Sequence, residues 1–323
     1  MGTTYSPRQS QYLEQDWKKT YLEVLDAGFD VIRLGAYWSE MEKEPDVFDF
    51  DDLDWQIAMA RKKGIQVLLT VGMKAPRWPE YFIPEWVFGK RLPPKGADLG
   101  KETYLCGRTL IFIRKVVERY KNEKSIRYWQ VENEPLDRMG AHKWWIGKSF
   151  LKREVELVRE LDPENRPIVI NVATYPNLLH RLWTRLFTSN DPIGESIELC
   201  DILGLNVYPV FGHKFLGYGY RVRSSKRARL EYLKKVVALA EKNGREVWAT
   251  ELQAEPWEPG QLVHKGKEQP STSSPEEFRE TLLELRSVGI DTVFLWGAEY
   301  WYFRKIRHND HLWWDTAVGL ARE

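Results

Sequence analysis

Apolar and polar positions follow two alternating periods along the chain. Short apolar runs rich in β-branched residues, typical of strands buried on both faces, alternate with longer segments whose apolar positions lie three or four residues apart. The runs predict strands at residues 3–5, 31–34, 66–71, 126–131, 168–171, 202–207, 247–250 and 292–296. The longer segments predict helices at residues 17–27, 53–63, 110–120, 144–161, 230–242 and 278–288.

Glycines end several of these helices, as Gly28, Gly64 and Gly289 do here, because a helix C-terminus often needs a left-handed residue. Eight strands alternating with helices imply a parallel sheet, and about 300 residues is the size of a (β/α)8 barrel. We therefore predict an α/β protein in which residues 1–323 form one (β/α)8 TIM-barrel domain. An open doubly wound sheet is the alternative, but Gly217-Tyr218-Gly219 lacks the third glycine of a phosphate-binding turn.

The composition is that of a globular protein, with 43% hydrophobic and 29% charged residues. No apolar run approaches the roughly 18 to 20 residues of a membrane span, so we expect no transmembrane segment. Met1–Tyr5 shows no basic segment followed by an apolar stretch, so we expect no secretory signal at this end. Two cysteines, Cys106 and Cys200, suit a reducing compartment. These features favour a cytoplasmic protein, or a secreted one if a signal peptide was removed.

Lysine and arginine (48) almost balance aspartate and glutamate (47), which argues against a nucleic-acid partner. The segment 214–235 is strongly basic and could contact an anionic polysaccharide or a membrane surface, although a solvated helix face with its loop is the simpler interpretation. His308 and His311 lack the carboxylate arrangement of a zinc motif. We predict no metal and no cofactor, and the sequence leaves the oligomeric state open.

Aromatic residues are abundant, with 15 Trp, 15 Tyr and 13 Phe. Flat aromatic faces pack well against the apolar faces of sugars or bases. This abundance favours a protein that binds one of those ligands, although any single tryptophan is more often a core residue.

Two glutamates follow predicted strands at the end where barrels carry their chemistry. Glu134 lies just after the strand at 126–131, and Glu251 directly follows the strand at 247–250. Two facing carboxyl groups can break a glycosidic bond: one donates a proton to the leaving oxygen, and the other attacks the anomeric carbon or activates water. Taken singly, each glutamate could equally be a solvated loop residue.

The heptapeptide Trp129–Pro135 (WQVENEP) resembles the Asn-Glu-Pro signature of clan A retaining glycoside hydrolases, which are (β/α)8 enzymes. The resemblance implies that Glu134 is the acid/base, that Glu251 is the nucleophile and that Asn133 binds a sugar 2-hydroxyl. It implies hydrolysis of β-linked oligo- or polysaccharides through a covalent glycosyl-enzyme. A transglycosylase with the same residues, or a carbohydrate-binding barrel without catalysis, are the alternatives.

The segments 32–38 and 44–54 resemble cellulase-like (family 5-like) and family 42 β-galactosidase-like members of the clan. This resemblance implies that Arg33 supports the nucleophile carboxylate and that Tyr208 hydrogen-bonds to it. It also implies sugar contacts from tryptophans at strand ends, namely Trp296 and, as further candidates, Trp38, Trp78 and Trp257. Asn171, Glu132 and Glu299 are weaker candidates near the same strand ends.

The sequence does not identify the sugar, because the Asn-Glu-Pro motif is shared by enzymes acting on gluco-, manno- and galacto-configured substrates. The segment 32–54 favours β-galactosidase-like families, whereas Asn133–Pro135 and Thr250–Gln253 favour cellulase-like ones. Endo or exo action depends on the long loops predicted at residues 74–107 and 172–200.

Overall fold

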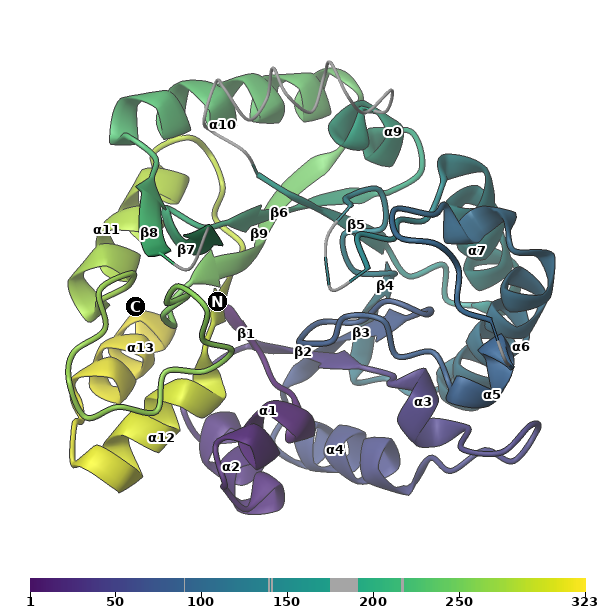
Figure 1. Ribbon diagram of the computed structural model, residues 1–323, viewed down its shortest axis with the longest axis horizontal. Helices are drawn as coiled ribbons and strands as arrows, with labels where there is room; N and C mark the ends of the chain where they lie inside the picture. The colour runs from purple at the N-terminus through teal and green to yellow at the C-terminus, as the bar shows by residue number, and fades with distance from the viewer. Residues whose placement is uncertain (90, 139, 141, 175–190, 216–217) are drawn as a thin grey trace. The chain divides into compact units, whose positions relative to one another are not determined.

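A computed structural model describes residues 1–323 except 90, 139, 141, 175–190 and 216–217 (Figure 1). Eight strands form a closed barrel in the order β1-β10-β9-β6-β5-β4-β3-β2, which confirms the predicted (β/α)8 TIM barrel. Their bounds are β1 Gly2–Thr4, β2 Val31–Gly35, β3 Gln66–Val71, β4 Ile126–Val131, β5 Ile168–Ala173, β6 Ile202–Val207, β9 Glu246–Gln253 and β10 Val293–Trp296.

The helices predicted from the sequence are present, and shorter ones accompany them. The helix expected from Trp144 begins at Lys148 instead, because the backbone N–H of Ile146 donates to Pro135 O and that of Gly147 to Asp98. The helices are α1 Pro7–Tyr12, α2 Trp17–Leu25, α3 Trp38–Met41, α4 Asp51–Lys62, α5 Glu85–Phe88, α6 Thr103–Tyr120, α7 Lys148–Leu161, α9 Pro192–Ile197, α10 Lys226–Lys242, α11 Pro275–Arg286, α12 Ala298–His308 and α13 Leu312–Arg322, with a 3-10 turn at Leu99–Lys101.

The chain divides into two compact units. Unit 1 holds residues 1–32 and 205–323 together with residues from Ala173, and unit 2 holds residues 33–172 and 190–204. Among the described residues, no helix combines the length and the apolar character that a membrane span requires.

Unit 2 is built on β3, β4 and β5. The three strands pair in parallel, with Leu69 opposite Trp129 and Trp129 opposite Ile168. All three side chains are fully or almost fully buried, as expected for strands covered on both faces. Helices α6 and α7 lie side by side next to these strands (Figure 1). This packing fixes the carboxyl end of β4, where the Asn-Glu-Pro segment begins.

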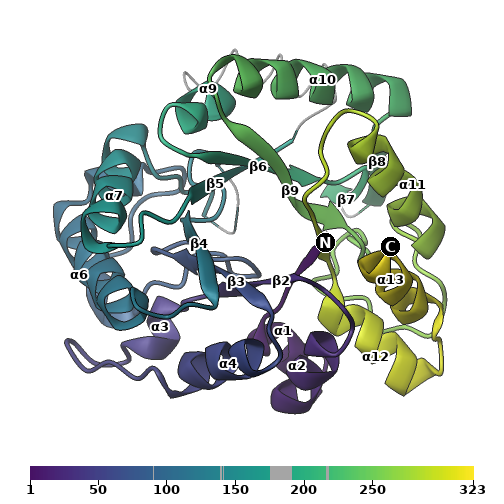
Figure 2. The ribbon, with the colours of Figure 1, turned by 180° about the vertical axis from the view of Figure 1, so that it is seen from behind.

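Unit 1 contains β1, β10 and β9, with helices α10 to α13. The views in Figures 1 and 2 agree in placing α12 beside α13. β9 is longer than predicted, because Leu252 and Gln253 still pair with Leu295 and Trp296 of β10. Glu251 therefore lies within the strand, near its carboxyl end, rather than after it.

A β-hairpin follows β6 in unit 1, formed by β7 (Val210–Phe215) and β8 (Tyr218–Arg223). The prediction of a helix face and loop over residues 214–235 is therefore wrong for its first part. The alternation of tyrosine or valine at 218, 220 and 222 with glycine or arginine between them is typical of a half-exposed strand. Gly212 and Gly219 let the hairpin approach Pro259, because a Cβ at either position would lie within 3 Å of that residue.

Candidate active site

The turn that follows β4 carries Glu132, Asn133 and Glu134. Glu132 has φ of 61° and Glu134 has φ of 46°, a left-handed conformation that is costly for residues with a side chain. Hydrogen bonds hold each residue in place: Glu132 N–H donates to Val71 O at 2.8 Å, Asn133 N–H to Lys74 O at 2.8 Å, and Glu134 N–H to Asn171 Oδ1 at 2.8 Å. The turn is thereby fixed by the strands on both sides of β4.

Asn133 lies at the centre of a buried polar network in unit 2. Its Oδ1 accepts hydrogen bonds from Arg33 Nη2 at 2.6 Å and from Asn171 Nδ2 at 2.9 Å. Arg33 also donates from Nε to Gln130 Oε1 at 2.8 Å, and Gln130 Nε2 donates to Asn171 Oδ1 at 3.1 Å. Because Arg33 and Asn171 both donate to the amide oxygen of Asn133, the network fixes the orientation of the Asn133 amide group.

Glu132 faces the segment after β3. Its carboxylate accepts hydrogen bonds from the backbone N–H of Met73 at 2.8 Å and of Lys74 at 2.6 Å. Burial raises the pKa of Glu132 to about 7, while burial and the neighbouring Glu132 carboxylate raise the pKa of Glu154 in α7 well above its usual range. Glu132 is fully buried and bonded to the backbone after β3, so it supports the turn. Glu134, in contrast, is 8% exposed.

Glu251 lies in unit 1 and is 5% exposed. The Tyr208 hydroxyl, just after β6, donates a hydrogen bond to Glu251 Oε2 at 2.8 Å. The Tyr208 ring meets the Trp257 ring edge-on, with centroids 5.5 Å apart. The neighbouring Thr250 hydroxyl donates to Asn206 Oδ1 at 2.8 Å, which ties β9 to β6 beneath the carboxylate. A phenol donor in this position orients the Glu251 carboxylate without adding a charge.

The predicted tryptophans differ in exposure. Trp78 and Trp257 are 40% and 42% exposed, and Trp296 at the end of β10 is 8% exposed. Trp38 is fully buried, donates from Nε1 to Glu42 Oε2 at 2.6 Å and stacks on Phe112. The structure therefore corrects the prediction for Trp38, because an indole packed on its face and bonded at its nitrogen has no surface for a sugar.

The remaining candidates from the sequence have structural partners. Glu299 is buried in the first turn of α12 and accepts a hydrogen bond from Ser6 N–H at 2.6 Å. In the basic segment, Arg223 pairs with Glu277, and the buried Arg229 pairs with Glu284 of α11. In the described part of the chain, no group of three or more His, Cys, Asp or Glu side chains could hold a metal ion.

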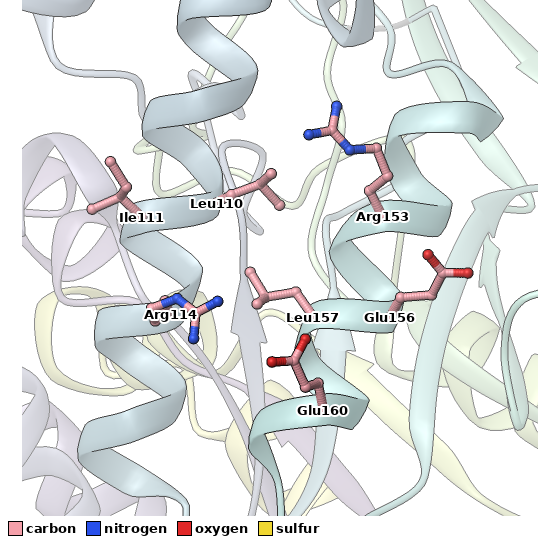
Figure 3. Close-up of a pocket in the computed structure, with 7 residues that line it drawn as sticks. All are labelled: Leu110, Ile111, Arg114, Arg153, Glu156, Leu157 and Glu160. Carbon is pink, nitrogen blue, oxygen red and sulfur yellow. The ribbon is translucent and has the colours of Figure 1, made fainter.

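A groove lies between α6 and α7, on the helix layer of unit 2 (Figure 3). Leu110, Ile111 and Leu157 form its apolar part, and charged side chains of both helices line the rest. It contains none of the residues at the strand ends, so it is distinct from the candidate site.

The closed barrel, with carboxylates near the carboxyl ends of its strands, defines the protein as a (β/α)8 barrel. The comparisons with known proteins agree with this fold class. Residues 4–150 match the family model Glyco_hydro_42, described as beta-galactosidase. A beta-galactosidase of Halorubrum lacusprofundi is 25% identical over 153 residues, 44% of this chain and 21% of that protein. A beta-galactosidase of Geobacillus kaustophilus is 29% identical over 143 residues, 41% of this chain and 21% of that protein. The matched part thus spans about a fifth of these relatives.

Solved structures of similar fold cover more of the chain. A beta-galactosidase from Marinomonas ef1 superposes with a TM-score of 0.62 at 16% identity, covering 91% of this chain and 53% of that one. The exo-beta-1,4-mannosidase Op5Man5 from an Opitutaceae bacterium superposes with a TM-score of 0.63 at 14% identity, covering 99% and 58%. The resemblance to clan A glycoside hydrolases with family 42 features is therefore confirmed. The matched sequence includes Glu134 and ends before Glu251.

Sequence reasoning missed three residues of the site. Gln130 bridges Arg33 and Asn171 from within β4, and Lys74 lies beneath the turn. Glu154, on the inner face of α7, is fully buried. Lys74 could have been found by inspecting the residues after β3 as closely as those after β4, since barrel chemistry gathers at all these strand ends.

Proposed function

We propose that this chain is a retaining glycoside hydrolase that cleaves β-linked oligo- or polysaccharides, with Glu134 as acid/base and Glu251 as nucleophile. The observation that carries the proposal is the Tyr208 hydroxyl bonded to Glu251 Oε2 near the carboxyl end of β9. A carboxylate so oriented suits attack on carbon, and the strained, multiply bonded turn at Glu134 suits a fixed proton donor.

In the first step, a Glu251 oxygen attacks the anomeric carbon and the bond from that carbon to the leaving oxygen breaks. Protonated Glu134 donates its proton to the leaving oxygen, which departs as an alcohol. The Tyr208 hydrogen bond keeps the other carboxylate oxygen in place as the ester forms. Asn133, held by Arg33 and Asn171, presents its amide to the sugar 2-hydroxyl.

In the second step, Glu134 removes a proton from water, and the water oxygen attacks the anomeric carbon of the ester. Glu251 is released as a carboxylate, and the sugar regains its original configuration. Retention requires carboxyl groups about 5 to 5.5 Å apart, whereas a water-mediated inversion needs about 6.5 to 9.5 Å. Trp296, Trp78 and Trp257 are our candidates for packing against sugar rings.

Two substrate classes are the first to test. The relatives matched in sequence are named beta-galactosidases, and one structural neighbour is named an exo-beta-1,4-mannosidase. We therefore propose galacto- and manno-configured β-glycosides as first substrates, with gluco-configured ones as the comparison. A panel of nitrophenyl glycosides, with β-glucan and β-mannan, separates these classes and distinguishes exo from endo action.

Substitution of the two glutamates tests their roles. We expect Glu251→Ala to abolish turnover of every substrate, because no nucleophile remains, and Glu134→Gln to abolish turnover of natural glycosides, which need a proton donor. A loss of about 10²-fold or more follows from removing a general acid. Initial rates of the purified variants, and NMR of the first-formed anomer from wild type, are the measurements.

Near wild-type rates for Glu251→Ala would reject the nucleophile assignment, and an inverted first product would reject retention. Two alternatives have their own signatures. A transglycosylase gives longer glycosides at high sugar concentration, and a carbohydrate-binding barrel binds oligosaccharides with no product from wild type.

A further inference from the structure

Lys74 is a fully buried lysine directly beneath the turn that carries Glu134. It follows the Gly72-Met73 pair at the carboxyl end of β3. It makes a hydrogen bond to each of three consecutive turn residues. Its backbone N–H donates to the Glu132 carboxylate at 2.6 Å, its backbone carbonyl accepts from Asn133 N–H at 2.8 Å, and its ammonium donates to Glu134 O at 2.9 Å.

Burying an ammonium is costly unless it is paired and hydrogen-bonded. Here Glu80 Oε2 lies 3.3 Å from Nζ, and the ammonium lies 5.6 Å from the centroid of the Tyr81 ring. Burial alone would lower the pKa of Lys74, but the carboxylate of Glu80 and the other acidic groups around it raise it overall. The side chain is therefore held as a charged donor.

An apolar side chain of similar length would fill the same space without the desolvation cost. What the lysine adds is the hydrogen bond from its ammonium to Glu134 O, and that bond supports an energetically unfavourable backbone. Both Glu132 and Glu134 have positive φ, so the turn is stable only if several surrounding contacts hold this backbone conformation. The Glu80 carboxylate, paired with Nζ, in turn holds the ammonium in place.

We propose that Lys74 is a positioning residue for proton donation, acting through the backbone of Glu134 rather than through contact with substrate. The inference rests on the proposed function, because it assigns Lys74 to the acid/base half of that reaction. A general acid must lie within hydrogen-bond reach of the leaving oxygen, and a displacement of about 1 Å can cost about 10²-fold in rate.

A positioning role makes a specific kinetic prediction. Departure of a 2,4-dinitrophenolate needs little proton donation, whereas departure of an alkoxide needs it fully. Lys74→Met should therefore lower kcat/KM, which reports the steps up to departure of the leaving group, by about 10- to 100-fold on an alkyl or natural glycoside and by less than about threefold on the dinitrophenyl glycoside. On the dinitrophenyl glycoside kcat and KM should fall together, because Glu134 is also the base that activates water in the second step.

A double variant and a matched control separate this role from loss of folding. Lys74→Met with Glu80→Gln removes both members of the ion pair, so the Glu80 carboxylate is not left without its ammonium, and the variant should fold and show the same leaving-group dependence. Arg166→Met is the control, since Arg166 forms a buried ion pair with Asp162 away from the turn. It should lower thermal stability while changing the rates on both substrates by equal factors.

Equal losses of kcat/KM on both substrates, or no loss on either, would overturn the positioning role. If wild type hydrolyses neither glycoside, the proposed function fails, and a crystal structure of the double variant still decides on Lys74. That structure should show Glu134 displaced from its wild-type backbone position. An unchanged turn in the double variant would overturn the inference independently of activity.

Discussion

Asn171 connects three parts of the candidate site through one amide. Its oxygen accepts from Glu134 N–H and Gln130 Nε2, and its nitrogen donates to Asn133 Oδ1. The sequence identified it as a weak candidate for substrate contact, whereas its described bonds make it a link between β5 and the turn after β4. A buried amide with its donor and acceptor both engaged orients its neighbours more sharply than a single contact does.

The hydroxyl of Tyr208 provides a direct test of Glu251 as the proposed nucleophile. Tyr208→Phe removes the hydrogen bond to Glu251 and keeps the ring against Trp257. A hydrogen bond to a charged group contributes about 1.5 to 3 kcal/mol, so kcat/KM should fall by about 10- to 100-fold. Tyr218→Phe, at an 81% exposed position of the same unit, is the matched control and should leave kcat/KM unchanged. Equal activity of the two variants would show that the Tyr208 bond is not used.

The buried pair of Glu132 and Glu154 makes stability depend on pH. Because the pKa of both carboxyls is raised in the folded state, the folded protein binds their protons more tightly than the unfolded chain does. Their stabilising contribution is complete below about pH 4.5 and is lost as pH rises through about 7 for Glu132 and through the raised pKa of Glu154.

Glu154→Gln removes one of these titrations, and with it the carboxyl group beside Glu132, while keeping the size of the side chain. Between about pH 5 and pH 8, the free energy of unfolding should fall by about 1 to 3 kcal/mol less than in wild type. Urea unfolding followed by tryptophan fluorescence at both pH values measures this. Glu156→Gln, on the exposed face of the same helix, should follow the wild-type dependence. If the free energy of unfolding of Glu154→Gln fell with pH as steeply as that of wild type, the shared burial of Glu132 and Glu154 would be contradicted.

At the scale of elements, the β7–β8 hairpin depends on close backbone approach. Gly212 N–H donates to Trp257 O at 2.9 Å, and a Cβ at Gly212 would lie 2.5 Å from Trp257 O. Real Cβ atoms do not approach oxygen so closely. A side chain at position 212 would therefore displace either the hairpin or the segment 257–259. Trp257 also packs against Tyr208, so the segment that the hairpin contacts is a direct neighbour of the Tyr208 ring.

Gly212→Ala should therefore destabilise the protein by about 1 to 3 kcal/mol, the usual cost of overpacking. Gly107→Ala is the control, because Gly107 lies in α6 with open space at the Cβ position. It should raise stability by up to about 1 kcal/mol, since alanine is the better helix former. Thermal melting temperatures of the two variants should move in opposite directions, and a parallel shift would contradict the packing described for the hairpin.

For the whole molecule, the repeating strand and helix pattern was sufficient to predict the barrel. Strands buried on both faces give strong apolar runs, which is why all eight were found within a few residues of their bounds. The hairpin after β6 was missed because its alternating pattern is short and lies within a basic segment. The actual beginning of α7 was missed because tertiary hydrogen bonds of Ile146 and Gly147 set it.

The candidate site was predictable where a motif marked it and not where burial decided it. Glu134, Asn133 and Glu251 follow from strand-end position and resemblance. The buried state of Trp38 and the place of Lys74 beneath the turn depend on neighbours far away in the sequence, such as Phe112 and Glu134. The matched family segment, residues 4–150, contains Glu134, the proposed acid/base, whereas the proposal for Glu251 rests on its geometry in unit 1.

Gly72 and Glu132 share one small volume between β3 and the turn. Gly72 has φ of +122°, and a Cβ there would lie 2.2 Å from Glu132 Oε1. A larger residue at position 72 needs both a shorter residue at position 132 and a backbone conformation that L-residues rarely adopt, whereas position 132 can change while Gly72 stays. The order of tolerated changes is therefore fixed: position 132 must become smaller before position 72 can accept a side chain.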